Sequence, residues 1–268
     1  MKPDLMPSVL TIMDSVSSLT GKGFEFREKR DLINFAAIKL ARGEMPAHII
    51  YFNPKHDQAI NHLIAHECGH ALRMWSVPEE ERLIPKCTEE TRDTALPQIL
   101  EDIPRAAQSL PIEKLAQLLN VQYHGVVQQL ISAPHDIMLE YWLYDDFPDL
   151  RPCQLTALYR QRIEALMGLE SLIARTVSAK IAAASNTMSY CFFRLVGLHI
   201  GLNLVSPYSG SEYVKRGKEL AEITARECRN DYSGDIAMIN RWAAFFELQD
   251  WFSWTDFEDV PADYLDVA

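Results

Sequence analysis

The segment from Ala59 to Trp75 constrains the fold of this chain more than any other feature. Its apolar residues recur at helical spacing, so one face must be buried; they are Ile60, Leu63, Ile64, Leu72 and Met74. The same segment contains His66-Glu67-Cys68-Gly69-His70, an H-E-x-x-H pattern whose two histidines lie one helical turn apart on one face. We therefore predict a half-buried helix over residues 57–75 that carries two converging imidazoles.

The sequence before this helix favours a small sheet. We expect a helix over residues 5–20, a strand over 23–28, and a second strand over 47–52, which is rich in β-branched and aromatic residues. Between the two strands, Asp31 is a suitable N-cap for a helix that ends near Gly43.

The sequence after the helix is helical almost to its end. A charged, proline-containing connection covers residues 76–97. The expected helices that follow are 98–109, 112–131, 134–146, 154–184, 187–204, 211–229 and 235–252. The fold class is therefore α+β and mostly α. We expect residues 1–146 to hold the sheet and the H-E-x-x-H helix, and residues 147–268 to form a helical bundle packed with them as one unit.

Composition and charge exclude several classes of partner. The chain has a formal net charge of −11, which argues against nucleic acid or an anionic membrane as the main partner. The most apolar stretch, Ile181 to Val205, contains Arg194 and is expected to be a buried helix rather than a membrane span. The five cysteines are scattered and the N-terminus lacks the pattern of a signal peptide, so we expect a cytoplasmic protein with reduced thiols.

The C-terminal segment, residues 245–268, is both acidic and aromatic. Its acids are Glu247, Asp250, Asp256, Glu258, Asp259, Asp263 and Asp266, and its aromatic residues are Phe245, Phe246, Trp251, Phe252, Trp254, Phe257 and Tyr264. A purely solvating tail would carry few aromatic residues. We expect the aromatic side chains to pack and the acids to face water, and the alternative is a segment that binds a protein partner.

The H-E-x-x-H pattern has a specific chemistry. Two imidazoles four residues apart can bind one zinc ion, which prefers tetrahedral sites with nitrogen ligands. Glu67 lies beside His66 and is suited to act as the general base on a zinc-bound water. His62, one turn before His66, gives a competing His62/His66 pair. We prefer His66/His70 because Glu67 directly follows the first histidine of this pair, as the general base of the H-E-x-x-H pattern does.

The third zinc ligand has two main candidates, of which the first is Glu140. It lies in an apolar helical stretch, where a carboxylate must be paired, protonated or bound to metal. The alternative partner for it is an arginine such as Arg194. Pro134 fits the first position of this helix, and Asp136 lies one turn before Glu140, where it could hydrogen-bond a ligating histidine.

The second candidate is Glu89, which follows His70 by 19 residues. Thr88 before it can be a helix N-cap, and acids are favoured in the first turn of a helix, so Glu89 also has a purely local explanation. The remaining candidates for the third ligand are His135, Asp136, Glu101 and His124.

A strand followed by an H-E-x-x-H helix resembles the zincin metallopeptidases, and the resemblance covers roughly residues 24–145. The metzincin extension would require glycine and histidine where this chain has Arg73 and Ser76, which leaves a gluzincin-like arrangement with a later glutamate as third ligand. The small, mostly helical build is also similar to the ImmA/IrrE type of intracellular zincin. The resemblance implies a hydrolase that cleaves a peptide or protein substrate laid in extended form along residues 47–52.

The residues thus favour a zinc metallopeptidase with Glu67 as catalytic base and His66, His70 and Glu140 as metal ligands. Two other hypotheses stay open. The zinc site could be non-catalytic in a regulatory protein that binds a partner through its C-terminal segment, or the chain could be a metal-dependent hydrolase that acts on something other than peptides.

Overall fold

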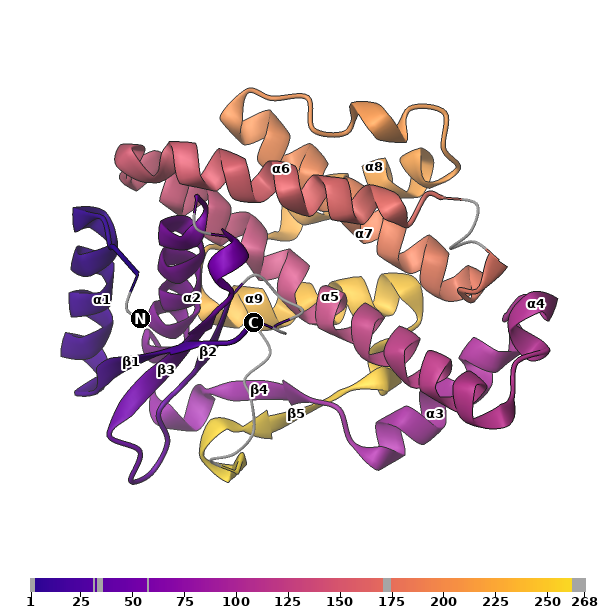
Figure 1. Ribbon diagram of the computed structural model, residues 1–268, viewed down its shortest axis with the longest axis horizontal. Helices are drawn as coiled ribbons and strands as arrows, with labels where there is room; N and C mark the ends of the chain where they lie inside the picture. The colour runs from indigo at the N-terminus through magenta and orange to yellow at the C-terminus, as the bar shows by residue number, and fades with distance from the viewer. Residues whose placement is uncertain (1–2, 31, 33–35, 57, 171–174, 262–268) are drawn as a thin grey trace. The chain divides into compact units, whose positions relative to one another are not determined.

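The computed structural model describes residues 3–30, 32, 36–56, 58–170 and 175–261 (Figure 1). The chain forms two compact units that alternate along the sequence. The first comprises residues 1–84, 138–160 and 255–268, and the second comprises residues 85–137 and 161–254. The units do not follow the boundary that we drew at residue 146, because α5 (Ile112–Asp146) and α6 (Arg151–Met167) each contribute to both.

The first unit contains a three-stranded sheet in the order β1-β3-β2. Strand β1 (Gly23–Glu28) runs parallel to β3 (Ala47–Phe52), with Gly23 opposite Ala47, and β2 (Ala36–Lys39) runs antiparallel to β3. Both predicted strands, 23–28 and 47–52, are confirmed. The helix predicted from Asp31 to Gly43 is wrong where the structure describes it, because residues 36–39 pair with β3 as a buried edge strand.

Two helices cover this sheet with apolar faces. In α1 (Pro7–Thr20) the buried residues Val9, Ile12, Met13 and Val16 recur at helical spacing, and Gly21 ends the helix with a positive φ of 69°. Helix α2 (Ile60–Trp75) packs against α1 (Figure 1). The predicted helices 5–20 and 57–75 are therefore confirmed, and Cys68 of the H-E-x-x-H segment is buried in their shared core.

The second unit is helical. Its helices, in addition to parts of α5 and α6, are α3 (Glu89–Glu101), α4 (Arg105–Gln108), α7 (Ala179–Ile200), α8 (Tyr213–Glu227) and α9 (Tyr232–Phe246). The prediction that 154–184 is one helix is wrong, since α6 ends at Met167 and α7 begins at Ala179. The prediction that a helix begins at Pro134 is also wrong, because α5 continues through this proline.

Two short strands, β4 (Leu83–Lys86) and β5 (Ser253–Asp256), form a two-stranded sheet that the sequence did not indicate. The short 3-10 helices are η1 (Pro54–His56), η2 (Glu79–Glu81), η3 (Pro148–Leu150), η5 (Ser206–Tyr208), η6 (Gln249–Trp251) and η7 (Phe257–Asp259). The fold is thus α+β and mostly helical.

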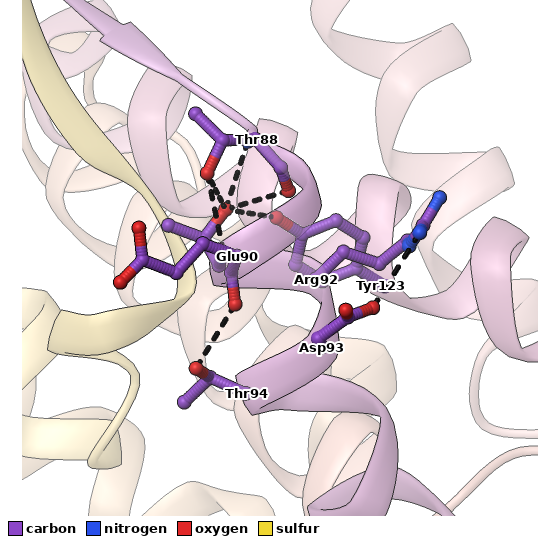
Figure 2. Close-up of polar contacts among 7 residues, drawn as sticks. Thr88, Glu90, Arg92, Asp93, Thr94 and Tyr123 are labelled. Carbon is purple, nitrogen blue, oxygen red and sulfur yellow. Dashed lines mark hydrogen bonds and ion pairs between the residues drawn. The ribbon is translucent and has the colours of Figure 1, made fainter.

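Helix α3 begins at a capping box. The Oγ1 of Thr88 accepts a hydrogen bond from the backbone N–H of Thr91 at 3.2 Å, and the N–H of Thr88 donates to Thr91 Oγ1 at 2.9 Å. Figure 2 shows this turn, with the hydroxyl of Tyr123 approaching it from α5. Glu89 and Glu90 are exposed in the first turn, as the local explanation of these acids predicted.

The most apolar stretch of the sequence is a buried helix, as predicted. Phe193 and Val196 of α7 are inaccessible or nearly so, and Arg194 is half-buried. Among the residues that the structure describes, no helix is both long and apolar enough to cross a membrane.

The described part of the C-terminal segment follows the packed interpretation. The aromatic residues Phe246, Trp251, Phe252 and Phe257 are buried. The acids in this part are all exposed; they are Glu247, Asp250, Asp256, Glu258 and Asp259. Asp263, Tyr264 and Asp266 lie outside the described residues.

Candidate metal centre

Three histidines lie on successive turns of one face of α2. The ring centroids of His62 and His66 are 5.9 Å apart, and those of His66 and His70 are 4.8 Å apart. His62 is buried, whereas His66 and His70 are partly exposed. The face therefore has a closed end at His62 and a more open end at His70.

Glu140 of α5 meets this face from within the same unit. Its Oε1 lies 3.1 Å from His62 Nε2 and 3.0 Å from His66 Nδ1. The side chain of Glu140 is only 4% exposed. The structure thus brings together His66 and Glu140, both predicted from the sequence, and adds His62, which we had set aside as a competing ligand.

The other carboxylate oxygen of Glu140 is held by α6. Gln154 Nε2 donates to Glu140 Oε2 at 2.6 Å and to the backbone carbonyl of Glu140 at 2.8 Å. Gln154 has no accessible surface. Nothing in the sequence singled out this residue, because it comes from a helix that is distant along the chain from the H-E-x-x-H pattern.

The electrostatics of the centre favour a charged Glu140. Burial raises the pKa of this carboxyl, but the charge of His62 and the hydrogen bonds from His62 and His66 outweigh it, so the pKa lies well below its ordinary value. A charged carboxylate beside two imidazoles offers oxygen and nitrogen ligands of the types that zinc binds.

The separations of 3.0 and 3.1 Å from Glu140 Oε1 to the two imidazole nitrogens are ordinary hydrogen-bond lengths. The same three groups could also hold a metal ion, because their ligand atoms lie within 4.8 Å of one another. With bonds of about 2.1 Å to nitrogen and oxygen, neighbouring ligand atoms of a tetrahedral zinc are roughly 3.4 Å apart, so metal binding would move these atoms apart by a few tenths of an ångström. In addition, His62 Nδ1 is buried without a hydrogen-bond partner among the described residues.

Glu67 is held by the sheet. Its Oε2 accepts a hydrogen bond of 3.0 Å from the backbone N–H of Ile38, in the edge strand β2, and the residue is buried. This bond fixes the orientation of the carboxylate beside the histidine face. The contact links the H-E-x-x-H helix to β2.

The sheet order corrects the expected path of the substrate. Residues 47–52 form β3, which has β1 on one side and β2 on the other. A central strand has no unpaired edge to offer to a peptide. A substrate laid along 47–52 is therefore excluded, and β2 is the edge strand that contacts Glu67.

The remaining candidates for the third ligand all lie in the second unit. Glu89 is exposed in the first turn of α3, and Glu101 and His124 are exposed as well. His135 and Asp136 are half-buried on α5, where Asp136 lies one turn before Glu140.

Comparison of the chain with protein-family models, with curated proteins and with solved structures finds no match in any of the three.

Proposed function

We propose that this protein is a zinc-dependent metallopeptidase with a zincin-like arrangement, in which His66, His70 and Glu140 bind the metal. The observation that carries the proposal is the contact between Glu140 Oε1 and His66 of the H-E-x-x-H helix, at 3.0 Å in a buried setting. A gluzincin-like centre requires a carboxylate from a later helix, and the contact of Glu140 with His66 supports that role for Glu140.

Each residue of the centre has a definite task under this proposal. When bound, zinc supplies a Lewis acid that lowers the pKa of water and polarises a carbonyl group. Glu67 takes up a proton on its carboxylate and later gives it to the leaving amine. The N–H of Ile38 keeps that carboxylate oriented throughout. An extended peptide would reach Glu67 along β2.

A second function is favoured by a specific observation. His62, His66 and Glu140 offer ligand atoms that lie within 4.8 Å of one another, and the His62 and Glu140 side chains are only 3% and 4% exposed. A zinc ion bound by this set would be closed off from substrate, which is typical of structural sites. The protein would then be a non-catalytic zinc protein, with its C-terminal segment as the candidate surface for a protein partner.

The experiment that tests the proposal combines metal analysis with hydrolysis of a peptide library. We expect about one zinc ion per chain in the wild type. Glu67→Gln should keep the zinc and lower peptide hydrolysis at least a hundredfold, because general-base catalysis contributes factors of about 10² to 10⁴. Glu113→Gln, at an exposed position in the first turn of α5, is the matched control and should change neither.

Three results would contradict the proposal. A wild-type protein that takes up no zinc after reconstitution has no such centre. Hydrolysis that survives Glu67→Gln is not catalysed as described. Zinc binding without cleavage of any peptide supports either the non-catalytic protein or a hydrolase for another substrate, and hydrolysis of small esters that depends on Glu67 separates these two.

A further inference from the structure

Gln154 makes an unusual pair of contacts with a single residue. Both of its hydrogen bonds go to Glu140, one to the backbone carbonyl at 2.8 Å and one to Oε2 at 2.6 Å. The side-chain amide has two N–H bonds, and both acceptors belong to the same residue. Gln154 therefore ties the carboxylate of Glu140 to its own backbone and restricts its rotation.

The orientation of this amide follows from its neighbours. The reverse orientation would place the amide oxygen against a carboxylate and a carbonyl, all of which are acceptors. In the observed orientation the oxygen of Gln154 is buried and has no hydrogen-bond partner among the described residues. An unsatisfied buried acceptor disfavours folding, so an apolar residue would suit packing better at this position. The contacts with Glu140 explain why a glutamine stands here.

We infer that Gln154 is a positioning residue of the zinc centre, which acts by holding Glu140 with Oε1 directed at His62 and His66. The inference rests on the proposed zinc centre. It holds whether the further histidine ligand is His62 or His70, because the contact between Glu140 and His66 is common to both sets. Residues that orient metal ligands in this way typically contribute 10- to 100-fold to metal affinity.

The test is a double-mutant cycle in zinc affinity, measured on the full chain by competition with a chromogenic chelator. Gln154→Met keeps the length of the side chain and removes both donors, and we expect it to weaken zinc binding 10- to 100-fold. In a Glu140→Ala background, Gln154→Met should weaken zinc binding no further, because Gln154 acts only through Glu140. A residue with a merely structural role would lower affinity by the same factor in both backgrounds.

Gln122 offers the matched control. It is also buried and also joins two segments, since its Nε2 donates to Thr176 O at 3.1 Å and its Oε1 accepts from Ser178 N at 2.9 Å. These contacts lie within the second unit, whereas Gln154 and Glu140 lie in the first. Gln122→Met should lower the melting temperature and leave zinc affinity within twofold of wild type.

The outcomes separate this inference from the proposed function. If wild-type protein binds no zinc, both fail. If wild type binds zinc and Gln154→Met binds it equally well, the inference fails and the zinc centre stands. An equal loss in both backgrounds also overturns it. If Gln154→Met does not fold, Gln154→Asn takes its place in the cycle, since the shorter amide stays polar but does not reach both acceptors. For Gln154→Asn, too, unchanged zinc affinity or an equal loss in both backgrounds would overturn the inference.

Discussion

Gly69 lies so close to Leu139, where α2 meets α5, that any larger residue at this position would force the Leu139 side chain to shift. A Cβ atom placed on Gly69 would be 2.7 Å from Leu139 Cδ2 and 3.2 Å from Trp142 Cζ3. Leu139 directly precedes Glu140, and both are buried. The glycine inside the H-E-x-x-H pattern therefore allows the close approach of the two helices that brings Glu140 to His66.

Gly69→Ala should consequently weaken both the fold and the proposed metal centre. Extra volume in a packed core typically destabilises a protein by about 1–3 kcal/mol. We expect a loss of this size in the free energy of unfolding, measured by urea denaturation, together with weaker zinc binding. A second substitution, Leu139→Ala, makes room for the new methyl group, so it should restore part of the zinc affinity lost in the single variant.

Gly125→Ala is the control for this prediction. Gly125 also lies inside a helix, but a Cβ atom there would meet no atom within 4 Å. Replacing a helical glycine by alanine in open space stabilises by up to about 1 kcal/mol. A lower free energy of unfolding for Gly69→Ala and a higher one for Gly125→Ala would establish that the close approach of Leu139 causes the destabilisation at Gly69. A stabilising Gly69→Ala would refute it.

The identity of the second histidine ligand decides between the two candidate functions. For a peptidase, we expect His70→Ala to lose zinc and hydrolysis, and His62→Ala to keep hydrolysis within about tenfold, an effect typical of residues that support a metal ligand. His66→Ala should lose zinc in either case. Zinc content by elemental analysis and peptide turnover are measured for all three. Loss of zinc in His62→Ala with full retention in His70→Ala would favour the closed, non-catalytic centre.

Local patterns in the sequence were sufficient for the helix and strands around the motif. The apolar spacing of α1 and α2 and the β-branched run of β3 are properties of consecutive residues, and the structure confirms them. That Glu140 has a partner was also expected from the sequence, because a carboxylate surrounded by apolar neighbours must be paired, protonated or bound to metal, and the structure places it against His66.

The features that the sequence did not reveal depend on tertiary contacts. Residues 36–39 contain alanines and follow a good N-cap, yet they form β2 because β3 provides a hydrogen-bonding edge and burial on both faces. Proline at 134 is accommodated inside α5, against the preference that we relied on. Gln154 leaves no local signal at all, since its function follows from its contact with Glu140.

His48 should make the stability of the fold depend on pH. Its Nδ1 accepts the backbone N–H of Ala41 at 3.0 Å, and its Nε2 lies 2.9 Å from Thr20 Oγ1, so the neutral ring suits both contacts. Burial, with a smaller effect of the Lys22 charge, lowers the pKa of His48 from 6.5 to about 4. The unfolded chain then binds a proton more readily than the folded one. The contribution of the neutral His48 ring to the free energy of unfolding is fully present above about pH 6.5. It is lost as the pH falls towards 4, and the full loss is about 3 kcal/mol.

Urea unfolding of wild type and His48→Gln between pH 4 and 7.5 tests this. Glutamine does not titrate, so the difference in unfolding free energy between the two proteins should shrink as the pH falls. A difference that stays constant with pH would show that the ring of His48 does not titrate as described.

Phe257 should be the main anchor of the C-terminal segment in the first unit. It is 1% exposed, the Arg42 guanidinium lies 4.7 Å from its ring centroid, and the Trp75 ring packs edge-on at 5.1 Å. Its backbone N–H also donates to Arg82 O at 2.8 Å. Phe257→Ala leaves a cavity and an exposed face of Trp75 at the end of α2, so we expect it to lower the free energy of unfolding by about 3–5 kcal/mol.

The neighbouring acids give the matched comparison. Glu258 and Asp259 are exposed, so Glu258→Gln and Asp259→Asn should change stability by less than about 0.5 kcal/mol. Thermal or urea unfolding of the three variants separates the packed and the partner-binding interpretations of this segment. A large decrease in the free energy of unfolding that occurs only in Phe257→Ala means that the aromatic residues anchor the segment to the fold. If Phe257→Ala were instead as stable as wild type, the segment would not be held by packing, and its aromatic residues would be accessible to a protein partner.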